Sequence, residues 1–353
     1  MTGATGFVAM HCILRLLEKG YRVRGTVRSA QRGKRVTDLI GKHADLGGDR
    51  LTLVEADLSG DAGWPQAVEG CDFVLHVASP VPKEAPKHED EVIVPARDGA
   101  LRVLKAAAKA GVKRVVMTSS TSSVLYGHPR DGSKTYDEND WSILNDEVGP
   151  YERSKTIAER ASWGYVRGLP EGERFEFVTV NPGVVLGPVL DKDFSVSGEV
   201  VRKLLTGEMP GCPNLGWAPV DVRDVADAHV AAMTIPEAAG RRFIVALEHV
   251  PMWQIAELLA KHYGPRGFKV PTRRLPDWVL KLVALWDKTA ALAVRELGKR
   301  QDVSSKLARD VLRWKPRNLE TMVIDMADSM IELGVVPQPR RGQSTPKRAT
   351  EST

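Results

Sequence analysis

The chain opens MTGATGFVAM, residues 1–10, and this glycine-spaced stretch decides the fold class. Gly3 and Gly6 are spaced as in a turn that joins a strand to a helix and lets the backbone approach a pyrophosphate, with Ala9 as a third small residue. The apolar pattern after the turn predicts a helix from about Phe7, whose positive end points at that anion. An ordinary tight turn is the alternative for glycines at this spacing.

Met1 leaves almost no room for the strand that should precede such a turn. In a doubly wound sheet that strand is central, and its loss would leave unpaired backbone groups on two strand edges, at roughly 1–3 kcal/mol each. The sum rivals the stability of a whole domain, roughly 5–15 kcal/mol. We therefore expect that the natural chain begins upstream and that the first strand is truncated here.

Strand-like and helix-like segments alternate after the turn. Short valine-rich runs predict buried strands at 21–28, 51–58, 73–79, 114–120 and 175–183. Helical patterns lie between them, at 9–20, 63–70, 98–111 and 154–168. Gly20 and Gly111 each end a helix where a left-handed cap is expected. The alternation predicts an α/β protein with a doubly wound, parallel Rossmann sheet.

The domain organisation follows from where this pattern stops. It loosens after residue 184, a strand–helix unit returns at 218–233, and 247–335 is mostly helical. We predict a nucleotide-binding Rossmann domain over 1–186 and 216–246, and a smaller, discontinuous carboxyl-terminal substrate domain over 187–215 and 247–335. The polar, basic end at 338–353 has the composition of a disordered tail.

Composition excludes several other classes. The net charge is +5, but basic residues outside the tail are interleaved with acidic ones, so no nucleic-acid partner is expected. The most apolar segment, 278–294, is interrupted by charges and predicts an amphipathic helix rather than a membrane span of roughly 20 residues. No signal peptide is recognisable, and Cys12, Cys71 and Cys212 lie far apart, which predicts reduced thiols, no metal site and a cytoplasmic protein.

The stretch GPYERSKTIAERASW carries the candidate chemistry. Tyr151 and Lys155 stand four apart at the start of a predicted helix and therefore share a face. An ammonium beside a phenol favours the phenolate, so we expect the pKa of Tyr151 to lie below the usual value of about 10. Tyr151 could then exchange a proton with a carbonyl or alcohol oxygen. A surface helix with this spacing by chance is the alternative.

The order of features narrows the interpretation. A glycine turn, a strand ending in TSSTSS (118–123) and a tyrosine–lysine helix follow one another, and this combination resembles the extended branch of the short-chain dehydrogenase/reductase superfamily. RGTVRS, HVASP, DENDWS, NPGVVLGP and DVRDVADAHVAAM are similar to segments of its dihydroflavonol reductase, cinnamoyl-CoA reductase and aldehyde/ketone reductase group. The resemblance covers about residues 1–335, and the absent first strand is its departure from the family.

The resemblance implies roles for individual residues. Tyr151 would be the general acid/base, Lys155 would bind the nicotinamide ribose, and Ser120 would hydrogen-bond the substrate carbonyl, with Ser119 and Ser122 as competitors for that role. Asp57 and Leu58 would flank the adenine. The implied cofactor-binding positions are Gly3, Thr5, Gly6, Phe7, Val8, Asp57, Leu58, Val77, Ala78, Ser79, Tyr151, Lys155, Pro182, Val185 and Ser197.

Cofactor choice can be argued from Arg28. An acidic residue at this position would hold the adenosine ribose hydroxyls and repel a 2′-phosphate. Arg28 stands there instead and is followed by Arg32, Lys34 and Arg35. A guanidinium binds a phosphate bidentately and stacks on adenine, so this basic run predicts NADP as the cofactor, with Arg28, Lys34 and Arg35 as binding residues. A solvated basic loop is the alternative.

These features predict an NADPH-dependent reductase of an aldehyde or ketone, a monomer or homodimer that takes a small-molecule carbonyl substrate. An NAD-dependent sugar-nucleotide epimerase or dehydratase, a hydroxysteroid dehydrogenase and a non-catalytic NADP-binding sensor remain alternatives. His11 and His76 are assigned no role, whereas Trp141 and Trp217 either contact an aromatic substrate or belong to the core. Loops around 80–95, 121–135 and 190–215 are expected to line the pocket.

Overall fold

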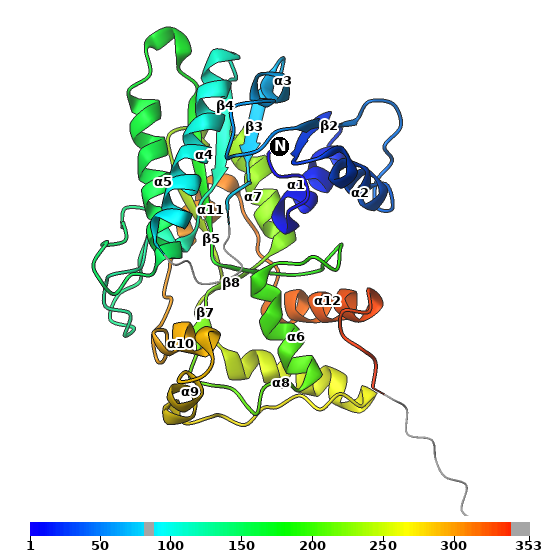
Figure 1. Ribbon diagram of the computed structural model, residues 1–353, viewed down its shortest axis with the longest axis vertical. Coiled ribbons are helices and arrows are strands. Elements are labelled where there is room, and N and C mark those ends of the chain that lie inside the picture. Colours follow the sequence, from blue (N-terminus) through cyan, green and yellow to red (C-terminus); the bar gives the residue numbers. More distant parts are fainter. Residues whose placement is uncertain (81–87, 340–353) are drawn as a thin grey trace, which may run out of the picture.

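The computed structural model describes residues 1–80 and 88–339, and it confirms the α/β fold class (Figure 1). All five predicted strands form, and a further parallel strand follows them. They are β1 (Val23–Val27), β2 (Leu51–Glu55), β3 (Phe73–His76), β4 (Arg114–Thr118), β5 (Glu176–Pro182) and β9 (Arg242–Val245). β1 pairs in parallel with β2, and β3, β4, β5 and β9 pair in that order as a second parallel set.

The first residues of the chain lie between these two sets. The amide of Thr2 donates to the carbonyl of Leu75 on β3, at 3.0 Å, and the amide of Ala4 donates to the carbonyl of Thr26 on β1, at 2.8 Å. The amide of Thr26 donates in turn to the carbonyl of Met1, at 2.9 Å. Residues 1–4 therefore occupy the place of the central strand and connect β1 to β3.

Helices cover both faces of the sheet, as a doubly wound fold requires (Figure 1). Side chains alternate along each strand, so Val116 and Val178 face one core whereas Val115 and Phe177 face the other. On the first face lie α1 (Phe7–Glu18), α2 (Ala30–Ile40), α7 (Val222–Thr234) and α11 (Lys306–Leu312). On the second lie α3 (Trp64–Val68), α4 (Asp90–Lys109) and α5 (Pro150–Arg167).

The predicted helix caps are confirmed, but two helices were missed: α2, and α6 (Glu199–Thr206) within the loop expected at 190–215. Gly20 and Gly111 have φ angles of 82° and 67°, in the left-handed region that favours glycine. α2 was not predicted, because its sequence AQRGKRVTDLI is mostly polar and buries only Gly33, Val36 and Ile40.

A separate hydrophobic core lies in the lower half of Figure 1. It joins α6 (Glu199–Thr206), α8 (Met252–Tyr263) and α12 (Leu319–Glu332). Two small sheets connect it to the main one: β6 (Val184–Leu186) pairs in parallel with β8 (Pro219–Asp221), and β7 (Gly216–Trp217) pairs antiparallel with β10 (Val250–Pro251). This second core supports the discontinuous substrate domain that we propose from the sequence.

The amphipathic segment at 278–294 differs from its prediction. Two short helices, α9 (Asp277–Val283) and α10 (Lys288–Val294), replace the single expected helix. Across residues 1–80 and 88–339, the structure contains no helix with the length and apolar character needed to span a bilayer. The predicted tail lies outside the described residues from 340 onward. Short 3-10 helices are η1 (Thr121–Ser123), η2 (Glu171–Glu173), η3 (Val196–Gly198), η4 (Pro236–Ala238) and η5 (Gly264–Arg266).

Candidate active site

The glycine turn has the geometry of an anion cradle. Gly3 has a φ of 65°, and a Cβ atom built on it would lie 2.9 Å from the Cβ of Ala78. Gly6 caps α1 without a side-chain hydrogen bond, and the first turn holds no acidic residue. The first turn of a helix leaves its amides without intrahelical acceptors, so those of Phe7 and Val8 remain for an external anion. Residues 1–8 therefore fit a pyrophosphate.

The basic run after β1 divides into two groups. Lys34 pairs with Asp38 on α2, at 2.7 Å, and Arg35 pairs with Asp191, at 2.5 Å. Arg28 and Arg32 are exposed, and none of the ion pairs found among the described residues involves either of them. The two unpaired guanidiniums fit a phosphate better than Lys34 and Arg35 do, and Arg32 was not among the predicted binding positions.

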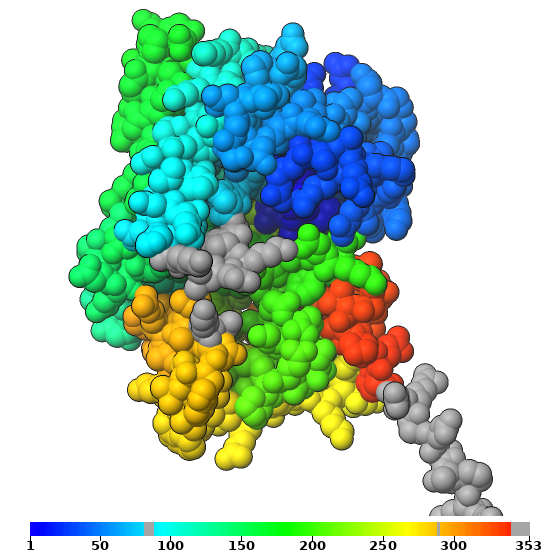
Figure 2. All heavy atoms as spheres, in the orientation of Figure 1, coloured from blue at the N-terminus to red at the C-terminus, as the bar shows by residue number. Residues whose placement is uncertain are grey.

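Figure 2 shows the outer surface where the blue amino-terminal part meets the green segment that follows β6. The Arg35–Asp191 ion pair joins these two parts, since Arg35 belongs to α2 and Asp191 follows β6. The ion pair therefore links α2 to the segment after β6 at the predicted phosphate end of the site.

The residues that follow β2 and β3 lie near this cradle. The carboxylate of Asp57 accepts from the hydroxyl and the amide of Ser59, at 2.6 and 2.8 Å, and these bonds lower the pKa of Asp57. The positive charge of Arg28 lowers the pKa of Asp57 further. Leu58 packs against Gly99, where an added Cβ would lie 2.9 Å from the Leu58 Cβ. Val77 and Ser79 are half-buried on either side of Ala78.

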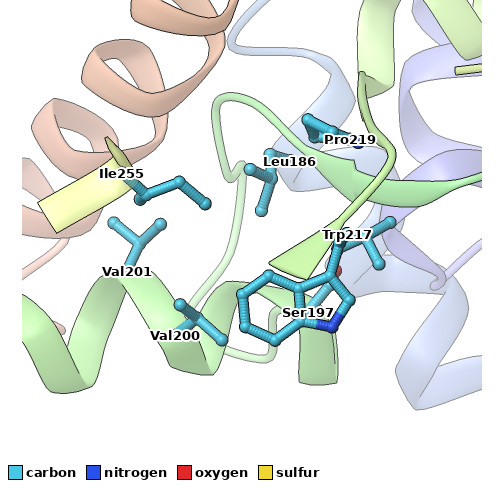
Figure 3. Close-up of a pocket in the computed structure, with 8 residues that line it drawn as sticks. Leu186, Ser197, Val200, Val201, Trp217, Pro219 and Ile255 are labelled. Carbon is cyan, nitrogen blue, oxygen red and sulfur yellow. The ribbon is translucent and has the colours of Figure 1, made fainter. Parts of the chain in front are cut away.

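The predicted nicotinamide side brings two residues together. The hydroxyl of Ser197 donates to the carbonyl of Val185, at 2.6 Å, beyond the end of β5 at Pro182. Ser197 and Trp217 also line an apolar cavity of about 10 Å³ (Figure 3). Such a cavity has room for no more than about one water-sized molecule. It is therefore not a substrate site, and Trp217 contacts the second core rather than an open pocket.

The three candidate serines after β4 differ in burial and in hydrogen bonding. Ser119 and Ser122 are buried, with 3% and 7% exposure, and the Ser119 hydroxyl donates to Glu159 at 2.5 Å. Ser120 is half-buried, and its hydroxyl accepts from the amide of Ser122, at 3.1 Å. The Ser120 side chain also lowers the pKa of Tyr151, so the two side chains lie near each other. The structure therefore brings Ser120, rather than its neighbours, to Tyr151.

Tyr151 and Lys155 lie on one face of α5, as predicted. The Nζ atom of Lys155 is 5.8 Å from the centroid of the Tyr151 ring. Lys155 is 8% exposed, and burial lowers its pKa to about 8, although Glu159 opposes that shift. The expected lowering of the pKa of Tyr151 was wrong. Burial, and then the charge of Glu152, raise this pKa to about 12, while Ser120 only partly offsets them. The phenol is therefore protonated near neutral pH.

Two residues that sequence reasoning missed lie behind this site. Glu159 is fully buried one helical turn beyond Lys155, and its Oε1 atom lies 2.7 Å from Nε of Arg242 on β9. Arg242 also covers the ring of Trp141, with its Cζ atom 3.7 Å from the ring centroid. One face of the Trp141 ring is therefore covered by a guanidinium. The spacing of Lys155 and Glu159 along α5 was the available signal.

The histidines have structural partners. The Nδ1 atom of His76 is 2.9 Å from the Thr2 hydroxyl, and Nε2 of His11 is 2.9 Å from the Pro188 carbonyl. In residues 1–80 and 88–339, no three His, Cys, Asp or Glu side chains group in a way that would hold a metal ion. The three cysteines are free thiols.

A parallel doubly wound sheet, an uncapped helix after a glycine turn, and a serine, tyrosine and lysine brought together beside it define an oxidoreductase of the extended short-chain dehydrogenase/reductase type. The chain belongs to the NAD dependent epimerase/dehydratase family, whose model matches residues 1–246.

Individual relatives narrow the comparison. The chain is 38% identical over 276 residues to cinnamoyl-CoA reductase 1 of Arabidopsis thaliana, covering 77% of this chain and 76% of that protein. It is 30% identical over 351 residues to the ketoreductase azaE of Aspergillus niger, covering 94% and 97%. Among solved structures it is similar to yeast methylglyoxal/isovaleraldehyde reductase Gre2 complexed with NADPH, with a TM-score of 0.79, 26% identity, and coverage of 95% and 98%.

Proposed function

We propose that this protein is an NADPH-dependent reductase of an aldehyde or ketone, in which Tyr151 gives a proton to the carbonyl oxygen. One observation carries the proposal: a half-buried phenol, with its pKa raised to about 12, interacts with the Ser120 hydroxyl and lies near the Lys155 amine. A phenol that is protonated at neutral pH has a proton to give to the carbonyl oxygen, and the nearby Lys155 ammonium favours the phenolate that this transfer leaves behind.

The chain's own residues fit the cofactor. The turn at Gly3 and Gly6 and the free amides at the start of α1 would hold the pyrophosphate. The unpaired guanidiniums of Arg28 and Arg32 would hold the 2′-phosphate, which favours NADPH over NADH. When bound, NADPH supplies the hydride. The NADPH complex of the yeast relative supports this choice.

The residues around the carbonyl would divide the remaining work. Ser120 would donate a hydrogen bond to the carbonyl oxygen and hold it beside Tyr151, since its hydroxyl is the half-buried one of the cluster. Tyr151 would release its proton to the same oxygen as negative charge develops there. Lys155, as an ammonium, would bind the nicotinamide ribose and stabilise the phenolate left behind.

A sugar-nucleotide epimerase is the nearest alternative within the family. Arg28 speaks against it, because an acidic residue at this position would favour NAD. A non-catalytic sensor is disfavoured by the retained tyrosine and lysine. We also propose a small-molecule carbonyl partner, a cytoplasmic location and a monomer or homodimer. Free cysteines support the location, and size-exclusion chromatography with light scattering would determine the oligomeric state.

The test compares Tyr151→Phe with Tyr165→Phe, a control tyrosine farther along α5. Carbonyl reduction is followed by loss of NADPH absorbance across a panel of aldehydes and ketones. We expect Tyr151→Phe to lose about 10²-fold or more of kcat, the contribution typical of general acid catalysis, while the Kd for NADPH is unchanged. The control should behave like the wild type. Near-normal turnover by Tyr151→Phe would reject the mechanism, and oxidant-free sugar-nucleotide epimerisation would favour the alternative.

A further inference from the structure

The buried carboxylate of Glu159 is the centre of a polar network inside the main domain. Its side chain has no exposed area, and Arg242, with 8% exposure, is its charged partner. Its second oxygen, Oε2, accepts from the hydroxyls of Ser119 and Ser123, both at 2.5 Å, and from the amide of Asn181, at 2.8 Å. Burial alone would raise the pKa of Glu159, but Arg242 and these donors outweigh burial and lower it, so the group is a carboxylate.

This network fixes the hydroxyl turn that carries Ser120. Ser119 precedes Ser120, and Ser123 follows it by one turn of η1. The side-chain amide of Asn181 on β5 also donates to the Ser120 carbonyl, at 3.2 Å. The backbone on both sides of Ser120 is therefore tied to one carboxylate, which sets the direction of the Ser120 side chain toward Tyr151.

Arg242 extends the same network to the DENDWS segment. Its Nη1 atom donates to the carbonyls of Glu138 and Asp140, at 2.9 and 2.7 Å, and its guanidinium lies on the Trp141 ring. Arg242 therefore has a packing role of its own, distinct from its charge. A lysine at this position would keep the charge but lose the planar fork.

Glu159 also acts on Lys155. The titratable groups that the structure places toward Lys155 are Tyr151 and Glu159 on α5 and His76 at the end of β3. Burial lowers the pKa of His76 to about 3 and raises that of Tyr151, so both are neutral near pH 7. The carboxylate of Glu159 is therefore the charge that favours the ammonium form of Lys155, with Arg242 behind it as the opposing charge.

We propose that the Glu159–Arg242 pair is a positioning unit of the active site, which holds the turn of Ser120 and stabilises the ammonium form of Lys155. The inference rests on the proposed function for the meaning of those two residues. A buried ion pair is often no more stabilising than an apolar pair of similar volume, so stability alone does not account for this one. The contacts of the pair with the turn of Ser120, and the place of Glu159 one helical turn beyond Lys155, give it a further role.

The test measures the titration of Lys155 directly. Competitive amine labelling across a range of pH, followed by mass spectrometry, gives the titration midpoint of Lys155 without any need for turnover. Glu159→Gln removes the charge and keeps the shape, so we expect the midpoint to move about one pH unit lower, as for loss of a nearby opposite charge. Glu171→Gln, at an exposed position, is the control and should not move it.

Activity then separates charge from packing. The alkaline limb of the pH profile of kcat should move to lower pH in Glu159→Gln by the same amount as the labelling midpoint. Arg242→Lys should leave the alkaline limb of the pH profile unchanged and lower kcat. The positive charge remains in this variant, whereas the hydrogen bonds to the carbonyls of Glu138 and Asp140 are lost. If the pair has a purely structural role, both variants should lose activity, but neither the labelling midpoint of Lys155 nor the alkaline limb of the kcat profile should move.

A double variant controls for misfolding caused by an unpaired buried charge. Removing one partner leaves a buried charge, whereas the double change Glu159→Gln with Arg242→Gln leaves none. We expect its Lys155 midpoint to move in the same direction as in Glu159→Gln but by less. An unchanged labelling midpoint in both variants would overturn the inference. A wild-type protein that reduces no carbonyl would reject the proposed function, yet the labelling result would still decide the effect of Glu159 on Lys155.

Discussion

Acid should destabilise this protein through three buried histidines. His11, His76 and His229 are 7%, 2% and 0% exposed, and burial lowers their pKa values to about 4, 3 and 4. In the unfolded chain each returns to a pKa of about 6.5. The unfolded state therefore binds more protons as pH falls below that value, and stability is lost progressively until the folded pKa values are reached.

The magnitude follows from these shifts. At about pH 5, proton binding by each of these histidines stabilises the unfolded state by about 2 kcal/mol relative to neutral pH. The three together therefore lower the free energy of unfolding by about 6 kcal/mol. That is comparable with the whole stability of a domain, roughly 5–15 kcal/mol. We expect the free energy of unfolding to fall steeply between about pH 6.5 and pH 4.

The assay is urea unfolding at about pH 7.5 and about pH 5, on the wild type and on His229→Gln. Nδ1 of His229 donates to the Val225 carbonyl, at 2.8 Å, and Nε2 accepts from the Thr118 hydroxyl, at 2.6 Å, so the variant is less stable at both pH values. The free energy of unfolding of the variant should nevertheless fall by about 2 kcal/mol less than that of the wild type between the two pH values. His43→Gln, at an exposed position, is the control. An identical loss in His229→Gln and wild type would refute the reasoning.

Two further predictions concern the cofactor cradle. Arg28→Ala should raise the KM for NADPH by about tenfold or more, because a charge-assisted bond to phosphate is lost, while the KM for NADH changes little; equal effects on both cofactors would contradict the assignment. Gly3→Ala should weaken NADPH binding in a fluorescence titration, because a φ of 65° costs alanine about 1–2 kcal/mol and its Cβ would press on Ala78. Gly20→Ala is the matched control, with a φ of 82° and open space around it, and it should lose stability without losing NADPH affinity.

Local patterns in the sequence predicted most of the fold. The alternation of strands and helices located β1 to β5, and the spacing of Tyr151 and Lys155 placed them on one helix face. These features depend on neighbours within a few residues along the chain. The single helix expected at 278–294 failed because apolar spacing does not reveal where a helix is broken.

The electrostatics of the site could not be predicted in the same way. The pKa of Tyr151 depends on its burial and on Glu152, and burial is a property of the assembled fold rather than of spacing. Lys34 and Arg35 looked equivalent to Arg28, but their partners Asp38 and Asp191 decide which cations remain free, and Asp191 lies 156 residues from Arg35. Sequence alone gives no such pairing.

The bonds of Arg242 also bear on the order in which the protein assembles. Arg242 contacts Glu159 and Ser123, which precede it by 83 and 119 residues, whereas the glycine turn contacts β1 and β3 within the first 80. Contacts between distant segments are slow to form, because a long loop must close first. A nascent chain can therefore complete its glycine turn early, but the turn that carries Ser120 is fixed only after β9 has been synthesised and docked.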